Sequence, residues 1–433
     1  MCYAIPGKIE KIENNTVTVD YFGEKRKALN ELAQVNVGDY IYAQGGFVVS
    51  KISPSEAESI LSVWKETFFE LQEVDLRLSR LSLSGNDADK RLLGVLDKAS
   101  QSRELTRDEL LYLLELEDKK ALELLFKTAN FLRQKHFKNS CCVHGIIEIS
   151  NHCRQGCSYC GISYHNKGLS RYRMTKDEIL KAAGEAVQVY GFKSLVLQSG
   201  EDPGYSISEL ADIIKEIKER FPVLIFISFG ETGIEGLEEL YRAGARGLLM
   251  RFETSNPKLY QDIHPGMSLE SRLSHLRRAY DMGYLVLTGG LIGLPGQAKE
   301  DILNDICLAK ELHAEMFSFG PFIPHPNTPF SKMIPVQPEE VFKTLAVARI
   351  IDNSHAKILV TTALETLSKY AAKSGLSGGA NSLMLNVTPL EYRPFYSIYP
   401  ERAHQSEDIS SQIESTISLL RSLGRAPTDL EGF

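Results

Sequence analysis

Residues 146–161 read IIEISNHCRQGCSYCG, and this stretch decides the fold of the chain. It begins as a short apolar run, which is typical of a buried strand, and it ends in a polar loop that contains three cysteines. The loop carries Cys153, Cys157 and Cys160 at spacings of four and three residues. Cysteine thiolates are the usual ligands of iron–sulfur clusters, and three of them leave one iron of a four-iron cluster open to bind another molecule.

A zinc site is the alternative interpretation of this loop. Structural zinc normally takes four Cys or His ligands. His152 is adjacent to the first cysteine, and His144 and His165 lie further away in the chain. Because none of them completes a usual zinc spacing, the pattern favours an iron–sulfur cluster.

The same unit, an apolar run followed by glycines or polar residues and then a helical stretch, recurs along the chain. Eight runs carry it: VHGIIEI, SLVLQSG, VLIFISFGE, GLLMRFET, YLVLTGGLIGLPG, EMFSFGPFIPHP, KILVTTALE and SLMLNVTP. Strands that alternate with helices in this way predict an α/β fold, a (β/α)8 TIM-type barrel over residues 139–400. In such barrels the reactive residues follow the carboxyl ends of the strands, where the polar motifs of this chain fall.

The first 50 residues show a different pattern of polar and apolar residues. Short runs that alternate polar and apolar residues, separated by Asn, Gly and Asp turns, predict a small all-β barrel of the OB-like kind. Ser53 and Pro54 then mark the start of a helix. The predicted organisation is a small barrel with its helix (1–72), a helical connector (73–138), the large barrel (139–400) and a C-terminal helical tail (401–433), with one amphipathic helix from Ile409 to Leu423.

Composition excludes several classes of protein. The 433 residues include 49 Lys and Arg against 56 Asp and Glu, a net charge of −7, so no nucleic-acid partner is expected. No apolar run reaches the length of a membrane span, and no secretory signal precedes the first charges. A cytoplasmic location is expected because no secretory signal is present, and the seven cysteines are too few for a disulfide scaffold.

The cysteine loop has the spacing CxxxCxΦC, with the aromatic Tyr159 before the last cysteine, and it resembles the signature of the radical SAM superfamily. The resemblance implies one 4Fe-4S cluster on the three cysteines, S-adenosylmethionine (SAM) on the open iron, and Tyr159 near the adenine. It also implies reductive cleavage of SAM to a 5′-deoxyadenosyl radical, with an electron donor such as ferredoxin or flavodoxin.

Within that superfamily, residues 104–400 resemble the FeFe-hydrogenase maturase HydE family. The matching stretches include RYRMT (171–175), LQSGEDP (197–203), RFET (251–254), GLPGQ (293–297) and GGANSLMLNVTP (378–389). The resemblance implies that the SAM-binding residues include Ser199, Gly200, Glu201, Arg251, Glu253 and Arg272.

Elementary chemistry agrees with several of these assignments. A carboxylate such as Glu201 can pair with an α-ammonium group, and Gly200 lets the backbone approach closely. Arg251 and Glu253 are expected to point to one side of a strand, where an opposed pair suits a zwitterion. Candidate substrate contacts are Thr361, Thr362, His325 and Asn386.

The cysteines outside the loop give no sign of a second iron–sulfur cluster. Some members of the family carry a second, C-terminal cluster on three cysteines, but this chain has no cysteine after Cys307, so no second cluster is expected. Cys307 stands at an apolar helix position and is expected to be buried. Cys141 and Cys142 precede the first barrel strand and are expected to take no part in the cluster.

The N-terminal residues MCYAIPGKI and VGDYIYAQGGFVVSKI (37–52) resemble the HypC/HupF family of hydrogenase maturation chaperones. The resemblance implies that Cys2, exposed by methionine removal, is an iron ligand for a species that carries cyanide and carbonyl. Gln44 stands where that family usually has a histidine. A tethered carrier would raise the concentration of its cargo at the mouth of the barrel.

The leading hypothesis is therefore a radical SAM enzyme of metallocofactor maturation, acting on an organometallic iron precursor of a hydrogenase active site together with other maturation proteins. One alternative is a radical SAM mutase or synthase acting on a small, amino-acid-like molecule, similar to methylornithine synthase or biotin synthase. The other alternative is a non-catalytic scaffold that carries iron between partner proteins.

Overall fold

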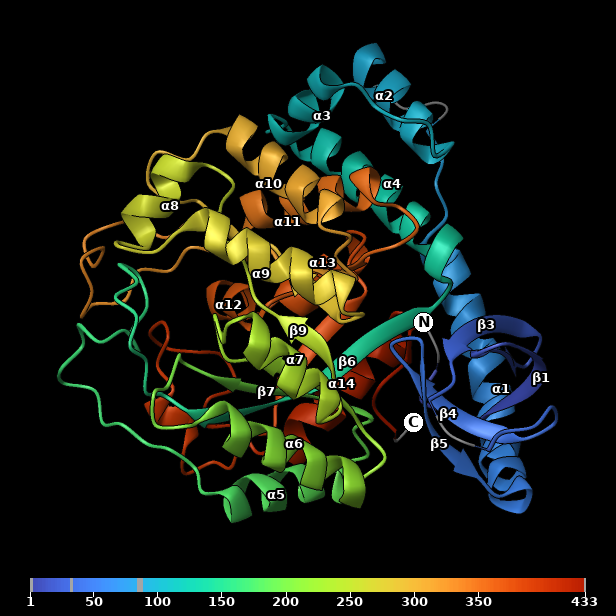
Figure 1. The fold of residues 1–433 in the computed structure, drawn as a ribbon. Helices are drawn as coiled ribbons and strands as arrows, with labels where there is room; N and C mark the ends of the chain where they lie inside the picture. The colour runs from blue at the N-terminus through green and yellow to red at the C-terminus, as the bar shows by residue number, and fades with distance from the viewer. Residues whose placement is uncertain (1–2, 32–33, 84–88, 432–433) are drawn as a thin grey trace.

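The computed structural model describes residues 3–31, 34–83 and 89–431. Cys2, the predicted iron ligand, lies outside the described residues. Figure 1 shows a small β-barrel, in blue, beside a much larger barrel that is surrounded by helices.

The small barrel is closed and all-β, as predicted. Its strands pair in the order β1-β2-β3-β5-β4. Val17 and Val19 of β2 and Ile41 of β4 are fully buried inside it. The strands are β1 (Gly7–Glu13), β2 (Thr16–Tyr21), β3 (Glu24–Leu29), β4 (Tyr40–Gln44) and β5 (Phe47–Ile52).

A long helix, α1 (Pro54–Leu78), leaves the small barrel and packs back on it. It begins where the sequence predicts, because Ser53 accepts a hydrogen bond from the Glu56 amide at 3.3 Å. Trp64 and Phe68 of this helix join the core of the small barrel. Three more helices lead to the large barrel: α2 (Lys90–Ser100), α3 (Arg107–Leu114) and α4 (Lys119–Phe137).

A buried charge cluster joins these helices to the end of the chain. Asp75 of α1 pairs with Arg133 of α4 at 2.7 Å and with Arg425 at 3.1 Å, and all three side chains are at most 2% exposed. Because a buried charge is costly without its partner, the cluster holds α1, α4 and the C-terminal segment in one arrangement.

The large barrel is parallel and contains all eight predicted strands. They pair in the order β14-β12-β10-β9-β8-β7-β6-β15, and a single bridge between Leu359 and Ser382 brings the last two neighbours together. The strands are β6 (Ser140–Ser150), β7 (Ser194–Ser199), β8 (Leu224–Ser228), β9 (Ala245–Leu249), β10 (Leu285–Thr288), β12 (Met316–Phe317), β14 (Lys357–Ile358) and β15 (Ser382–Asn386).

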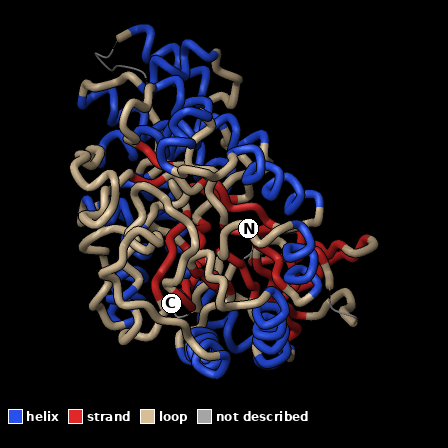
Figure 2. Tube along the Cα trace, turned by 60° about the vertical axis from the view of Figure 1, so that its left-hand side comes forward, coloured by secondary structure: helices blue, strands red, loops and turns tan. Residues whose placement is uncertain are grey.

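Helices form a shell around these strands, as Figure 2 shows in blue around red. A short sheet of β11 (Leu291–Ile292) and β13 (Gly320–Pro321) continues two of the strands, and β16 (Ala426–Pro427) pairs with β6. The helices are α5 (Lys176–Gly184), η1 (Glu185–Val189), α6 (Ile207–Arg220), α7 (Ile234–Arg242), α8 (Pro257–Ile263), α9 (Leu269–Asp281), α10 (Lys299–Glu311), α11 (Pro338–Ile351), α12 (Thr362–Leu367), α13 (Ala371–Ser377), η2 (Arg393–Phe395) and α14 (Ile409–Ser422).

One buried residue was predicted wrongly. Cys307 lies on α10, and its side chain is exposed. The buried face of this helix carries Ile302, Leu303, Ile306 and Ala309 instead. The apolar neighbours of Cys307 in the sequence therefore belong to the other face of the helix.

The small barrel docks on the amino ends of the large barrel's strands. Phe47 and Val49 of β5 pack against apolar residues inside the large barrel, such as Leu224 and Leu287. Arg246, at the start of β9, forms an ion pair with Glu31 at 2.9 Å. The loop that follows β6 lies at the opposite end, as Figure 1 shows. The small barrel and the cysteine loop therefore lie at opposite ends of the large barrel.

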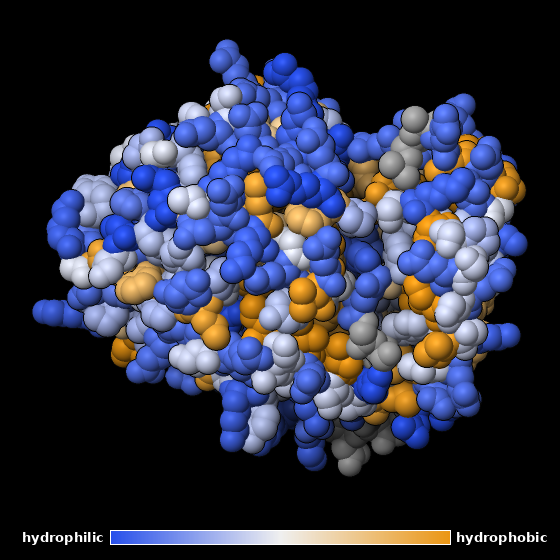
Figure 3. All heavy atoms as spheres, turned by 90° about the horizontal axis from the view of Figure 1, so that it is seen from below, coloured by the Kyte–Doolittle hydropathy of each residue, from blue (hydrophilic) through white to orange (hydrophobic). Residues whose placement is uncertain are grey.

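The surface is polar over most of the face seen in Figure 3, with apolar side chains in smaller groups. Within the described residues, no helix combines the length and the apolar character that crossing a membrane requires.

Candidate active site

The loop that follows β6 is irregular, and polar side chains hold its shape. Arg171 donates hydrogen bonds to the backbone carbonyls of Ile162 at 2.7 Å and Ser163 at 2.8 Å. Asn151 donates to the carbonyl of Ser170 at 2.8 Å and accepts from the amide of Tyr172 at 2.8 Å. These bonds hold the loop in shape around its cysteines. They also give hydrogen-bond partners to backbone groups that lie outside helices and strands.

Cys153, Cys157 and Cys160 are all half-buried in this loop. Burial raises the pKa of the Cys160 thiol to about 12 and also raises the pKa of Cys153. The three sulfur atoms do not form a group with all members within 4.8 Å of one another, although such a group occurs elsewhere among the described residues. The three thiols are therefore not gathered as tightly as the ligands of one metal ion, and binding of a cluster by them would displace the thiol protons.

His264 stands beside the loop and was not predicted. Its Nδ1 lies 3.1 Å from Sγ of Cys157, and its Nε2 is buried without a partner in the described structure. Burial and the positive charges of Arg272 and Arg251 lower the pKa of the ring, which keeps the imidazole neutral.

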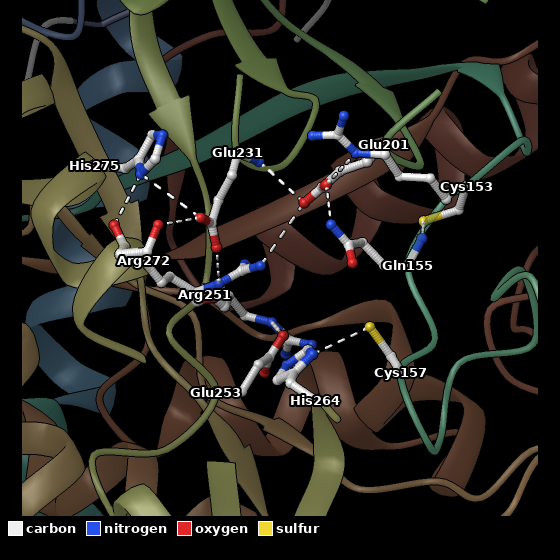
Figure 4. A network of polar contacts seen from close by, with 12 residues as sticks. Cys153, Gln155, Cys157, Glu201, Glu231, Arg251, Glu253, His264, Arg272 and His275 are labelled. Atoms are coloured by element: carbon white, nitrogen blue, oxygen red, sulfur yellow. Dashed lines mark hydrogen bonds and ion pairs between the residues drawn. The ribbon is translucent and has the colours of Figure 1, made fainter. Parts of the chain in front are cut away.

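Glu201, two residues after the end of β7, belongs to the network of polar contacts in Figure 4. Its carboxylate accepts hydrogen bonds from the Glu231 amide at 3.1 Å and from Nε of Arg154 at 3.2 Å. Gln155 of the cysteine loop donates to the same carboxylate at 2.5 Å. Glu201 therefore connects the cysteine loop to the end of β8.

Gly200 stands where the backbone passes closest to the cysteine loop. A β-carbon at this position would lie 2.3 Å from the carbonyl oxygen of His152 and 2.6 Å from Cβ of Cys153. Only glycine allows this approach, as the sequence suggested. Ser199, one residue earlier, lines the adjacent cavity.

Arg251 and Glu253 come together, but not as residues of a strand. β9 ends at Leu249, so the predicted strand alternation is wrong, and Glu253 has a left-handed backbone with φ of 69°. Nε of Arg251 lies 3.2 Å from Oε1 of Glu253, which also accepts from the Tyr159 hydroxyl at 3.3 Å. Oε2 of Glu253 is buried and has no partner within the described residues, so it can accept from a bound ligand.

Arg272 reaches the same centre from α9. Its Nε lies 3.3 Å from Oε1 of Glu231 and 3.1 Å from the hydroxyl of Tyr260, and its Nη1 donates to the carbonyl of Arg251 at 3.1 Å. Glu231 also accepts from the Ser271 hydroxyl at 2.7 Å. Figure 4 shows Glu231 between Arg272 and Glu201. Sequence reasoning missed Glu231, although it closes the predicted strand run VLIFISFGE.

A cavity of about 260 Å³ lies inside the carboxyl end of the barrel, beside these residues. Its walls include the predicted residues Ser199, Arg251, Glu253, Arg272, Thr361 and Thr362. Glu148 of β6 and Arg402, neither of them predicted, also line it. The cavity is thus walled by groups of both charge signs, and it can hold a small polar or zwitterionic molecule.

The two other candidate substrate residues lie outside the cavity lining. Asn386 donates to Oε2 of Glu148, a residue of the cavity wall, at 3.1 Å. His325 packs against Gly161 of the cysteine loop, and its Nε2 lies 3.3 Å from the Ser397 hydroxyl. Burial lowers the pKa of His325.

A parallel eight-stranded barrel with a three-cysteine loop after its first strand and a charged cavity beside that loop defines a radical SAM enzyme. Family models agree: the model of the radical SAM superfamily matches residues 147–308, and that of the HupF/HypC family matches residues 1–64. Such enzymes use a 4Fe-4S cluster and SAM.

Comparison with curated proteins narrows the family. The [FeFe] hydrogenase maturase subunit HydE of Thermotoga maritima is 39% identical over 333 residues, which span 77% of this chain and 94% of that protein. The 3-methylornithine synthase of Methanosarcina barkeri is 27% identical over 76% of this chain and 93% of that protein. The chain belongs to the HydE family of radical SAM enzymes and carries an N-terminal HupF/HypC module.

Solved structures share the fold. A crystal structure of methylornithine synthase (PylB) superposes with a TM-score of 0.69 at 26% identity, over 77% of this chain and 97% of that one. The FeFe-hydrogenase maturase HydG from Carboxydothermus hydrogenoformans gives a TM-score of 0.67 at 20% identity, over 86% of this chain and 84% of that one. The second likeness concerns the fold alone.

Proposed function

We propose that this chain is a cytoplasmic enzyme of hydrogenase maturation, which uses one 4Fe-4S cluster and SAM to act on an iron carbonyl/cyanide precursor of a hydrogenase active site. Cys153, Cys157 and Cys160 hold the cluster. When bound, the cluster supplies the electron that cleaves SAM and yields a 5′-deoxyadenosyl radical.

The residues around the cavity would bind and orient SAM. Glu201 would form an ion pair with the α-ammonium group of SAM, and Arg272 would form one with the carboxylate of SAM. Tyr159 borders the adenine, and Gly200 leaves room for the ligand beside the loop. The orphaned Oε2 of Glu253 supports this assignment, because a buried acceptor without a partner calls for a donor from the ligand.

The single observation that carries the proposal is the charged cavity beside the cysteine loop, in a chain that matches a hydrogenase maturase over nearly all of that protein's length. Thr361 and Thr362 are the proposed substrate contacts in its wall. An electron donor of the ferredoxin or flavodoxin class is required, and other maturation proteins are the proposed partners.

The small barrel would hold the iron species on Cys2 before the large barrel acts on it. Apolar side chains such as Phe226, Met316 and Met384 pack in the interior between the small barrel and the cavity. The cargo would therefore leave the small barrel and enter the cavity from the carboxyl end.

A second candidate function is a mutase or synthase reaction on an amino-acid-like substrate. The charge pair of Glu148 and Arg402 in the cavity wall favours it, since this pair could bind the two ends of a zwitterion. The similarity to methylornithine synthase points the same way.

The test is anaerobic. The cluster is reconstituted and reduced, SAM is added, and 5′-deoxyadenosine is quantified in the wild type and in Cys157→Ala, with Cys307→Ala as a control for general thiol loss. We expect 5′-deoxyadenosine from the wild type and the control only. A bound cluster and bound SAM without any cleavage, even with iron carbonyl/cyanide complexes or ornithine-like amino acids present, would leave the iron-carrying scaffold as the better explanation.

The carrier part is tested separately by the affinity of an iron carbonyl/cyanide complex for the full chain. We expect Cys2→Ala to bind this complex more weakly than the wild type does. Equal binding would remove the carrier role and leave the radical chemistry untouched.

A further inference from the structure

A second cluster of metal-binding side chains lies at the end of the large barrel that is opposite the cysteine loop. Cys142 and His144 are two residues apart on β6, so both point into the barrel interior. Asp429 reaches them from the C-terminal segment that pairs with β6 through β16. One ligand atom from each of the three residues lies within 4.8 Å of the others, and all three residues are buried.

We propose that Cys142, His144 and Asp429 bind one divalent transition-metal ion of the iron(II) or zinc(II) class, at the junction of the large barrel, the small barrel and the C-terminal segment. A thiolate, an imidazole and a carboxylate together suit these metals rather than magnesium or calcium, which prefer oxygen ligands alone.

The charges balance in such a site. A thiolate and a carboxylate neutralise a divalent cation, and the imidazole adds no charge. The nearby Lys357 and Glu315 line the same small cavity and form an ion pair with each other. A buried metal with these ligands therefore adds no net charge to the interior, which keeps the cost of its burial low.

Two unsatisfied polar groups mark the same junction. Nδ1 of His144 is buried and has no hydrogen-bond partner in the described part of the chain, while Nε2 of the same ring lies 3.5 Å from Asp429. Stacking on Phe226 at 4.9 Å fixes the plane of the ring. A buried ring nitrogen without a partner is expected where an ion or a water completes the site.

Gln44 is the second unsatisfied group. Ile41 and Ala43 of β4 belong to the core of the small barrel, so Gln44 points outward on the same face as Tyr42, whose ring lies under Lys193 of the large barrel. The Gln44 side chain is fully buried, and neither of its amide atoms has a partner among the described residues. Gln44 is next in sequence to Gly45, and Gly45 lines the small cavity that Cys142, His144 and Asp429 also line.

The size of the space limits what can occupy it. The cavity enclosed by Gly45, Cys142, His144 and Asp429 measures about 10 Å³, which admits one atom-sized guest and no organic molecule. An iron with several carbonyl and cyanide ligands does not fit. The site is therefore suited to a bare ion that fastens three parts of the chain together, and it is independent of the function proposed for the carboxyl end.

The test uses the full chain in which Cys153, Cys157 and Cys160 are replaced by alanine, so that the loop cannot bind the probe. Cobalt(II) is titrated anaerobically, and the thiolate-to-cobalt charge-transfer absorption is recorded. We expect one cobalt per chain, displaced by iron(II) or by zinc(II), and the order of displacement tells which metal the site prefers. In this same triple-alanine chain, zinc is expected to raise the unfolding temperature.

Cys142→Ser should abolish the charge-transfer band and weaken binding by more than about tenfold, since it removes the softest ligand. Cys141→Ser is the matched control, because Cys141 is equally buried but faces the other side of the strand. Asp429→Asn provides a second variant that keeps the size of the side chain.

Three outcomes would overturn the proposal. They are a folded parent chain that binds no cobalt, a Cys142→Ser variant that binds as the parent does, and loss of the band in Cys2→Ser but not in Cys142→Ser. The last result would assign the metal to the thiol of Cys2, and it would then concern the carrier role proposed for the small barrel.

Discussion

Arg402 forms a buried ion pair with Glu148 in the wall of the cavity. Nη1 of the arginine lies 3.2 Å from Oε2 of the carboxylate, and the two side chains are 8% and 2% exposed. The pair joins the first strand of the barrel to a segment 254 residues later in the chain. It therefore closes the cavity on the side where the last strand gives way to the C-terminal residues.

Arg402→Leu should destabilise the protein strongly. The substitution leaves the Glu148 carboxylate buried without its cation, and removal of one partner of a buried pair typically costs about 3–5 kcal/mol. Urea unfolding of the chain, followed by circular dichroism, measures this loss. The double variant Glu148→Leu/Arg402→Leu should recover most of it, because no uncompensated charge remains. Equal stability of the single and double variants would contradict this account of the pair.

This pair also shows where sequence reasoning stops. All eight barrel strands could be predicted, because each is an apolar run followed by a polar loop, and that pattern is local. Glu148 stands out as a charge inside the apolar run IIEI, but nothing local indicates its partner. Arg402 lies in a segment that was predicted to be a C-terminal tail, and only the closed barrel brings it to the cavity.

The site could be predicted in part for the same reason. The structure gathers the loop cysteines, Ser199, Glu201, Arg251 and Arg272 at one end of the barrel, where their motifs follow successive strands. Glu231 and His264 lie among them without a distinctive motif. The small barrel docks on the amino ends of the large barrel's strands through complementary surfaces. Such complementarity leaves no periodic pattern of apolar residues in the sequence, so it could not be predicted.

Gly200→Ala should impair the cysteine loop. The added methyl group would lie 2.3 Å from the His152 carbonyl oxygen and 2.6 Å from Cβ of Cys153, so the loop must move. We expect a lower iron and sulfide content after anaerobic reconstitution, with the fold of the barrel retained. Gly168→Ala is the matched control, because a methyl group there meets only Asn166 at 3.9 Å. Full cluster loading in Gly200→Ala would show that the close approach is not required.

Gly45→Ala should loosen the small barrel from the large one. Its β-carbon would lie 2.7 Å from Leu285 and 2.8 Å from Leu224, at the interface between the two barrels. Gly46→Ala is a suitable control, since both glycines have positive φ but a methyl group at Gly46 meets nothing within 4 Å. Hydrogen exchange of β4 and β5 should therefore rise more in Gly45→Ala than in Gly46→Ala. Equal exchange in both variants would mean that backbone strain alone accounts for the effect.

His404 should make the stability of the protein depend on pH. The Glu365 carboxylate and, next to it, that of Glu407 lie 3.5 and 2.5 Å from the two ring nitrogens and raise the pKa of this imidazole to about 9. The unfolded chain has a histidine pKa of about 6.5. Because the folded state holds the proton more tightly, the contribution to stability is complete below about pH 6.5, declines as the pH rises and is lost above pH 9.

The size of this effect is at most about 3.5 kcal/mol, since each pKa unit corresponds to about 1.4 kcal/mol. His404→Gln should remove the decline in the free energy of unfolding between pH 6.5 and 9, measured by urea titration at each pH. His355→Gln, at a histidine whose side chain is 55% exposed, should leave the decline in place. A wild-type stability that stays level across this range would contradict the assignment, because the two carboxylates could not then be holding a proton on His404 that the unfolded chain releases.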